Sequence, residues 1–156
     1  MTSESPELTI SRYIPAPASA IWKAWSGAEQ LEQWWIPAPI ECKVIKLDLR
    51  PGGGFETQMR EGGGQFKPHL EGCFLEIEPE KRLVFTTVLA EGWAPIEPWL
   101  ALTAIITFEP EGQGTRYSAR VLHKNAADSR KHKEMGFQEG WGATIDQLAA
   151  FVKNQG

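Results

Sequence analysis

Apolar residues recur at helical spacing near the C-terminal end of the chain. The members of this stripe are Phe137, Trp141, Ile145, Leu148 and Val152. Steps of three and four residues place all five side chains on one face of an α-helix. The pattern predicts a long amphipathic helix that ends at about residue 153, with Trp141 buried at its centre. A stripe this wide needs a large concave partner.

The start of this helix contains glycines, and a different pattern precedes it. Gly136, Gly140 and Gly142 lie in the first turns, where each costs about 1 kcal/mol relative to alanine in a helix interior. Glycine at these positions indicates close approach by sheet backbone or by a ligand. Because the apolar stripe does not extend upstream, we predict a kink or a separate short helix from Ala126, with Asn125 as its N-cap.

The N-terminal part predicts one strand over residues 8–14 and then two short helices. Pro17 suits the first turn of the first helix. The segment Ser26-Gly-Ala-Glu29 matches a capping box, so we expect the second helix to start there and to run to about residue 34. The two helices form an aromatic wedge that contains Trp22, Trp25, Leu31, Trp34 and Trp35.

The middle of the chain alternates between apolar and polar residues, as β-strands do. The predicted strands cover residues 42–48, 55–60, 69–77, 82–89, 100–108 and 115–122, with a bulge at Gly72. Short links make this run antiparallel. We therefore predict an α+β fold in which a curved antiparallel sheet of about six to seven strands surrounds the long C-terminal helix.

Composition limits the class of protein. The chain of 156 residues fits a single domain, 1–156, with a core over about 8–153. A net charge of −4 disfavours a nucleic-acid partner, and no apolar run is long enough for a membrane span. The N-terminal segment does not resemble a signal peptide, so we expect a cytoplasmic protein in which Cys42 and Cys73 are reduced thiols. Seven Trp and seven Phe are a large aromatic content for this length.

Motifs for catalysis, metals and cofactors are weak or missing. Pro51-Gly-Gly-Gly54 leads into a strand and predicts a hairpin turn rather than a phosphate loop. His69, His123 and His132 lack short metal-ligand spacing, so we predict neither a metal nor a cofactor. No residue stands out as catalytic, although His69 in an apolar pocket would have a shifted pKa. Such a residue more often orients a ligand.

The order of elements and several short motifs resemble a known family. The markers, spread over residues 8–153, are Ala16-Pro-Ala-Ser-Ala-Ile-Trp22, Leu31-Glu-Gln-Trp-Trp35, Gly52-Gly-Gly-Phe55, Gly72-Cys-Phe-Leu-Glu-Ile-Glu-Pro79, Leu83-Val-Phe-Thr86 and Met135-Gly-Phe-Gln-Glu-Gly-Trp141. In this order they resemble the family named after the activator of heat-shock-protein-90 ATPase. This family is part of the START-like, birch-allergen superfamily, whose domains are also called SRPBCC.

The resemblance implies a helix-grip fold around an apolar pocket, and no catalytic residues shared by the family. The eukaryotic activator carries a separate N-terminal chaperone-binding domain. A chain of 156 residues has no room for one, which argues against a chaperone partner. We expect a domain that binds a small apolar or aromatic ligand. The alternatives are an enzyme of the polyketide cyclase or aromatase kind and a chaperone-associated interaction module.

The predicted pocket wall combines aromatic residues of the wedge, the strands and the final helix. It comprises Trp35, Phe55, Met59, His69, Phe85, Trp99, Tyr117, Met135, Phe137, Trp141 and Ile145. About half of the helical stripe would belong to the core and half to this wall.

The loop over residues 90–99 is long and rich in apolar residues. It contains Trp93, Ile96 and Trp99, separated by Pro95 and Pro98. Long loops tend to carry function, and apolar side chains on a stiff loop form a patch. We expect a homodimer contact through this loop in preference to a lid over the pocket. A third interpretation is that its Trp side chains only cap the core.

Overall fold

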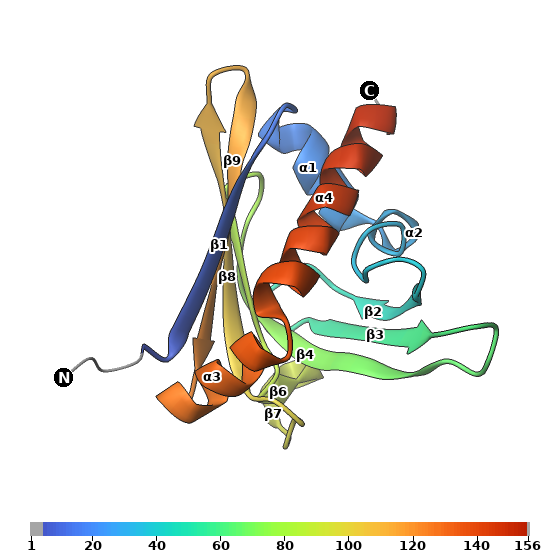
Figure 1. Ribbon diagram of the computed structural model, residues 1–156, viewed down its shortest axis with the longest axis vertical. Coiled ribbons are helices and arrows are strands. Elements are labelled where there is room, and N and C mark those ends of the chain that lie inside the picture. Colours follow the sequence, from blue (N-terminus) through green and yellow to red (C-terminus); the bar gives the residue numbers. More distant parts are fainter. Residues whose placement is uncertain (1–4, 156) are drawn as a thin grey trace.

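The computed structural model describes residues 5–155. Figure 1 shows one long helix crossing the concave side of a curved sheet, with two short helices beside its C-terminal half. The helices are α1 (Ala18–Ser26), α2 (Ala28–Leu31), α3 (Ala126–Glu134) and α4 (Phe137–Gln155). The main strands are β1 (Glu7–Ile14), β2 (Glu41–Leu47), β3 (Gly54–Arg60), β4 (Lys67–Glu78), β5 (Arg82–Thr86), β8 (Leu102–Glu111) and β9 (Gly114–His123).

These seven strands form one antiparallel sheet in the order β1-β9-β8-β5-β4-β3-β2. Consecutive strands from β2 onward are neighbours, and β1 completes the sheet by pairing with β9. The predicted α+β fold is confirmed: a curved sheet of seven strands holds the C-terminal helix, and two short helices follow the first strand.

The helical stripe is buried as predicted, with one exception. Phe137, Ile145, Leu148 and Val152 are at most 5% exposed, whereas Trp141 is only half-buried. The break before α4 is also confirmed. The side chain of Asn125 accepts a hydrogen bond from the backbone N–H of Asp128, and Gly136 between the two helices has a φ of 97°. This left-handed conformation favours glycine.

Two local predictions at the N-terminal half are wrong. Ser26 does not cap α2, because its hydroxyl donates to the carbonyl of Trp22, 2.6 Å away, and so belongs to the end of α1. Helix α2 starts at Ala28 after Gly27 and ends at Leu31, short of residue 34. The chain continues as turns that carry Trp34 and Trp35 into the interior.

Gly72 is not a bulge. The pairing of β4 with β3 shifts at His69, and the pairing of β4 with β5 shifts at Leu75, whereas Gly72 stays in register opposite Phe55. A Cβ atom at Gly72 would lie 2.6 Å from the carbonyl oxygen of Thr86, so glycine permits close strand approach here.

The segment between β5 and β8 is more ordered than predicted. Strand β5 ends at Thr86, and a small hairpin follows, formed by β6 (Leu89–Ala90), a short 3₁₀ turn η1 (Glu91–Trp93) and β7 (Ala94–Pro95). The indole of Trp93 lies against Gly52, where an added Cβ atom would be 2.8 Å from its Nε1. The φ of 83° at Gly52 also favours glycine. The remainder, residues 96–101, leads back to the main sheet.

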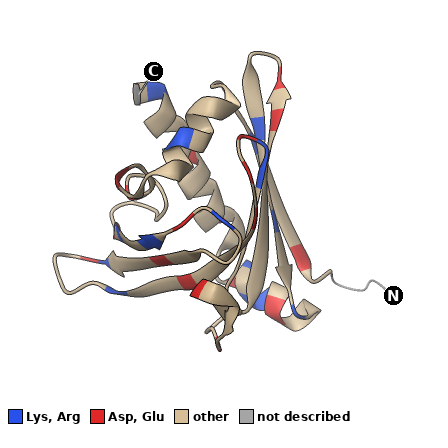
Figure 2. Cartoon of the chain, turned by 180° about the vertical axis from the view of Figure 1, so that it is seen from behind, with Lys and Arg blue, Asp and Glu red and all other residues tan. Residues whose placement is uncertain are grey.

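Charged residues of both signs are interspersed along the outer strands (Figure 2). Four Arg–Glu pairs connect neighbouring strands. The N···O distance is 2.8 Å in Arg60–Glu41, Arg116–Glu111 and Arg120–Glu7 and 3.2 Å in Arg82–Glu76. All are partly exposed to solvent, and such surface pairs contribute at most about 1 kcal/mol each. Burial of the apolar interior therefore supplies most of the stability.

A polar contact ties the wedge to α4. The side-chain amide of Gln147 donates to the carbonyls of Trp34 and Ile36 at 3.0 and 2.9 Å, and its Oε1 accepts from the N–H of Ala38 at 2.7 Å. These three bonds hold the segment that carries Trp35 against the helix.

We expect Gln147→Glu to lower the free energy of unfolding by about 1–3 kcal/mol, because a carboxylate cannot donate to two partly buried carbonyls. Gln33→Glu is the matched control, since Gln33 is exposed and makes one long bond of 3.4 Å. Denaturant unfolding of both variants measures the difference. Equal midpoints for the two variants would contradict this role of Gln147.

Candidate functional site

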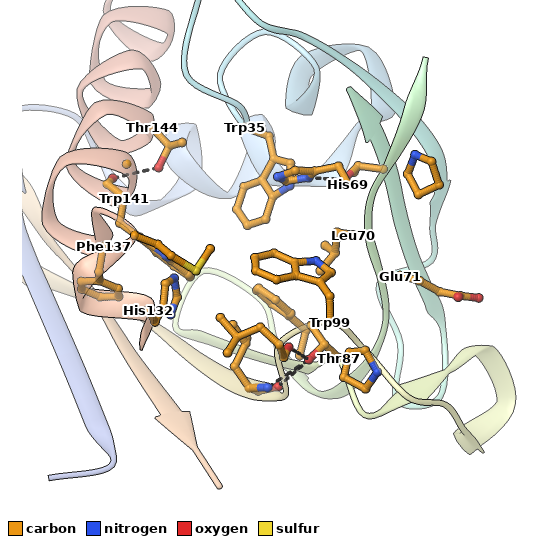
Figure 3. Close-up of a pocket in the computed structure, with 18 of the residues that line it drawn as sticks. Trp35, His69, Leu70, Glu71, Thr87, Trp99, His132, Phe137, Trp141 and Thr144 are labelled. Atoms are coloured by element: carbon orange, nitrogen blue, oxygen red, sulfur yellow. Dashed lines mark hydrogen bonds between the residues drawn. The ribbon is translucent and has the colours of Figure 1, made fainter. Parts of the chain in front are cut away.

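A cavity of about 540 Å³ lies between the N-terminal half of α4 and the sheet. Its wall is formed by the end of α3 and the first turns of α4, by β3, β4 and β5, by Trp35 and by residues 96–102. Figure 3 shows Trp35, Trp99 and Trp141 around the same space. Helix α4 therefore closes the core with its C-terminal half and borders the cavity with its first turns.

The structure places most of the predicted pocket residues on this wall: Trp35, His69, Phe85, Trp99, Met135, Phe137 and Trp141. The other four do not line the cavity. Phe55, Tyr117 and Ile145 are fully or almost fully buried in the core, and Met59 lies on β3 beyond the shift at His69. Tyr117 instead accepts a hydrogen bond from the indole N–H of Trp25 at 3.1 Å, and burial raises its pKa.

Several wall residues were not predicted. They include three threonines, a histidine, a glycine and aliphatic residues: Thr57, Thr87, Thr144, His132, Gly140, Leu70, Ile96, Leu100 and Leu102. A Cβ atom at Gly140 would have no neighbour within 4 Å, so the helix presents open space there. The glycine in the helix pattern was the signal for this position. Thr144 gave a weaker signal, because it lies at the edge of the stripe.

Trp35 connects the core to the cavity. Its ring centroid lies 5.2 Å from Trp25, 5.3 Å from Phe55 and 6.4 Å from Trp141. Its Nε1 atom is buried and has no hydrogen-bond partner among the described residues. A buried donor without a partner costs about 1–3 kcal/mol, so this N–H lowers the stability of the packed aromatic cluster.

The threonine hydroxyls on the wall are engaged by the protein itself. Thr144 donates to the carbonyl of Trp141 at 2.8 Å, and Thr87 donates to the carbonyl of Leu100 at 2.9 Å. Thr87 also accepts from the N–H of Leu102 at 3.0 Å. The protons of these two hydroxyls are therefore not available to a ligand.

His69 on β4 and Thr57 on β3 form a pair on the side of the cavity that the sheet provides. The Nδ1 atom of His69 lies 2.9 Å from the hydroxyl oxygen of Thr57, and burial lowers the pKa of His69. The shift in β4 makes His69 the extra residue opposite β3, which turns its side chain inward. Either group can donate in this pair, so the hydrogen bond leaves the tautomer of His69 open.

A second histidine pair lies at the end of α3. Nε2 of His123 is 2.9 Å from Nδ1 of His132, and Nδ1 of His123 is 2.8 Å from the carbonyl oxygen of Pro6. The ring of His132 meets the ring of Phe137 edge-on at 5.1 Å. Burial, and then the neighbouring His123, lower the pKa of His132 to about 4. The ring is therefore neutral near pH 7.

Carboxylates lie only at the rim. Glu71 and Glu97 are exposed and Glu56 is half-buried, and the side chain of Glu71 points away from the cavity (Figure 3). The wall itself is dominated by aromatic and aliphatic side chains with a small number of fixed polar groups. Such a surface suits a compound with an apolar body.

A family model described as "Activator of Hsp90 ATPase homolog 1-like protein" matches residues 15–153. The chain belongs to this family. A solved structure of a protein from Nitrosomonas europaea is 37% identical, covers 96% of each chain and has a TM-score of 0.89. A Mycobacterium smegmatis protein is 26% identical over 94% of this chain and 90% of that chain, with a TM-score of 0.76. No curated protein matches.

A further solved structure shares the fold at lower identity. A structure from Arthrobacter aurescens is 24% identical, covers 96% of this chain and 87% of that chain, and has a TM-score of 0.80. This similarity extends over the whole helix-grip arrangement and shows the fold alone. Membership of the Hsp90 ATPase activator-like family is compatible with ligand binding and with polyketide cyclase-like chemistry, and it does not specify a ligand.

Within residues 5–155, no three His, Cys, Asp or Glu side chains are grouped to hold a metal ion. No helix in that range is long and apolar enough to cross a membrane. Both cysteines are free, and burial raises the pKa of Cys42 to about 12, which keeps this thiol protonated and unreactive.

The lowered pKa of His132 predicts a dependence of stability on pH. In the unfolded chain the ring has its ordinary pKa of 6.5, whereas in the folded protein its pKa is about 4. The unfolded state then binds more protons, so stability is complete above pH 6.5 and falls as the pH is lowered toward 4. His69 acts in the same direction.

We expect the wild type to lose more stability between pH 7 and pH 5 than His132→Asn, by about 1 kcal/mol after allowance for the partial exposure of the ring. Chemical denaturation at the two pH values measures the difference. Lys133 follows His132 in the sequence and is exposed, so Lys133→Gln is the control. This variant should lose as much stability between pH 7 and pH 5 as the wild type. Identical slopes for wild type and His132→Asn would refute the assignment.

Proposed function

We propose that this protein binds small, largely apolar or aromatic compounds in the cavity between α4 and the sheet. The observation that carries the proposal is the cavity itself, which has about 540 Å³ of space and a wall of Trp, Phe, Leu and Ile side chains. This volume lies in the range of small-molecule sites. An apolar compound that enters gains about 25 cal/mol for each Å² of apolar surface removed from water.

The polar groups of the wall define what the compound carries besides its apolar body. The Nε1–H group of Trp35 has no partner among the described residues, but the atom is buried and therefore closed to a ligand in this conformation. The hydroxyl protons of Thr87 and Thr144 are engaged by backbone carbonyls. The wall therefore has few polar groups free to bind a ligand, which supports a ligand with few polar atoms.

A second candidate function is catalysis of the polyketide cyclase or aromatase kind. Two wall histidines with lowered pKa values favour it, because shifted histidines are typical of active sites. A general base is most effective with a pKa near the working pH, and a value of about 4 for His132 makes this ring a weak base. Ligand binding is therefore the primary proposal. Turnover of a linear poly-β-keto substrate by the purified protein would favour the enzyme.

Gly140→Leu provides a direct test of cavity binding. A side chain at this position would extend into open space on the cavity wall, and leucine is about 1 kcal/mol more favourable than glycine in a helix. We expect the variant to remain folded and at least as stable as the wild type, but to lose binding of phenylnaphthylamine, a neutral dye whose fluorescence rises in apolar surroundings.

Gly142→Ala is the matched control for this test. It lies on the same helix, away from the cavity wall, where an added Cβ would make ordinary contacts of 3.6 and 3.7 Å. It should bind the dye like the wild type. If wild-type protein fails to bind the dye, or if Gly140→Leu binds it equally well, the proposed site is wrong.

The loop of residues 90–99 provides a second test, because its two Trp residues differ in position. Trp99 lines the cavity and is 66% exposed, whereas Trp93 is 48% exposed and lies against Gly52. We expect Trp99→Ser to weaken dye binding at least several-fold and Trp93→Ser to leave it unchanged. The proposed homodimer through this loop is tested in the same samples by sedimentation. A dimeric wild type that either substitution makes monomeric would support the dimer.

A further inference from the structure

We propose that His132 selects ligands that carry a hydroxyl or N–H group, by accepting a hydrogen bond from that group through its Nε2 atom. The inference rests on the proposed function and names the ligand class more closely, as an aromatic compound with a donor such as a phenol. It is carried by the arrangement of Pro6, His123 and His132.

The hydrogen bonds in this arrangement determine which nitrogen carries each proton. The carbonyl oxygen of Pro6 can only accept, so Nδ1 of His123, 2.8 Å away, must be the donor. In a neutral imidazole the other nitrogen is then an acceptor. Nε2 of His123 therefore accepts from Nδ1–H of His132 across 2.9 Å. The neutral ring of His132 is left with an unprotonated Nε2.

This second nitrogen is the available atom of the ring. His132 lines the cavity, and within residues 5–155 its Nε2 makes no hydrogen bond. The ring lies edge-on to Phe137 and 6.4 Å from the ring of Trp141 (Figure 3). The acceptor therefore stands beside aromatic surface, where the ring of a ligand and its hydroxyl group are recognised together.

Other wall groups do not provide an equivalent acceptor. The indole N–H of Trp35 can only donate. The tautomer of His69 is not determined by its bond to Thr57, since either partner can donate. The carboxylates of Glu71 and Glu97 lie on exposed residues. Glu56 is half-buried, but it precedes the buried Thr57 on β3, so its side chain points to the other face of the sheet. His132 is thus the group on the wall whose state as an acceptor is set by the fold.

The test compares naphthol, methoxynaphthalene and naphthalene by calorimetric titration near pH 7. These compounds share a ring system and differ in having a donor, only an acceptor, or neither. We expect the wild type to bind naphthol about tenfold more tightly than methoxynaphthalene, the equivalent of one net hydrogen bond. Naphthalene reports on apolar binding alone.

Two substitutions separate the acceptor from the fold. In His132→Asn the amide N–H can still donate to His123 but Nε2 is gone, so the preference for naphthol should disappear while naphthalene binds as before. In His123→Asn the amide can still donate to Pro6, but His132 loses the partner that fixes its tautomer. The preference should then fall to a few-fold. His69→Gln should keep the wild-type preference.

The outcomes distinguish the two proposals. If the wild type binds none of the three compounds, both fail. If it binds all three with equal affinity, or if His132→Asn keeps the preference, cavity binding stands and the role of His132 is wrong. Nitrogen-15 NMR of the wild-type rings gives an independent reading that needs no variant. A protonated Nε2 on His132, or an Nε2 resonance that naphthol leaves unchanged, would also overturn the inference.

Discussion

The burial of the α4 stripe on the concave face of the sheet is the interaction on which the rest of the structure depends. Leu148 and Val152, with Ile145, fill the space between the helix, α1 and the sheet. A flat sheet could not cover so wide a stripe, so the sheet must curve, and a curved sheet is broader than one helix can fill. The aromatic wedge closes one end of the opening. The space at the other end remains as the cavity.

Two features set where packing stops and the cavity begins. Gly140 leaves open space on the wall between the side chains that α4 contributes there, and Gly136 turns the chain so that α3 approaches from another direction. Gln147 fixes the segment that carries Trp35 through three hydrogen bonds, which places one indole between the core and the open space. Trp35 therefore has both roles: its ring packs against the core and also forms part of the cavity wall.

Much of the fold could be predicted because it depends on patterns within short windows. The stripe from Phe137 to Val152 and the alternation of the strands follow directly from burial. The errors arose where tertiary contacts decide. Ser26 matches a capping box, but its hydroxyl bonds to the preceding turn. Gly72 suggested a bulge, yet its role is to admit the carbonyl of Thr86 from the neighbouring strand, which no local pattern reveals.

The apolar character of the site was predictable, but of its polar groups only His69 was predicted. The aromatic character and the predicted face of Trp35, Phe85 and Trp141 placed them on the wall. His123 and His132, in contrast, are nine positions apart, a spacing that matches no motif. They meet because His123 is the last residue of β9, and α3, which carries His132, packs back against that strand. The carbonyl of Pro6 accepts both the backbone N–H and the ring Nδ1–H of His123, so the start of β1 orients this ring. The acceptor on the cavity wall is therefore set by a backbone group outside the cavity, which only the assembled sheet brings into place.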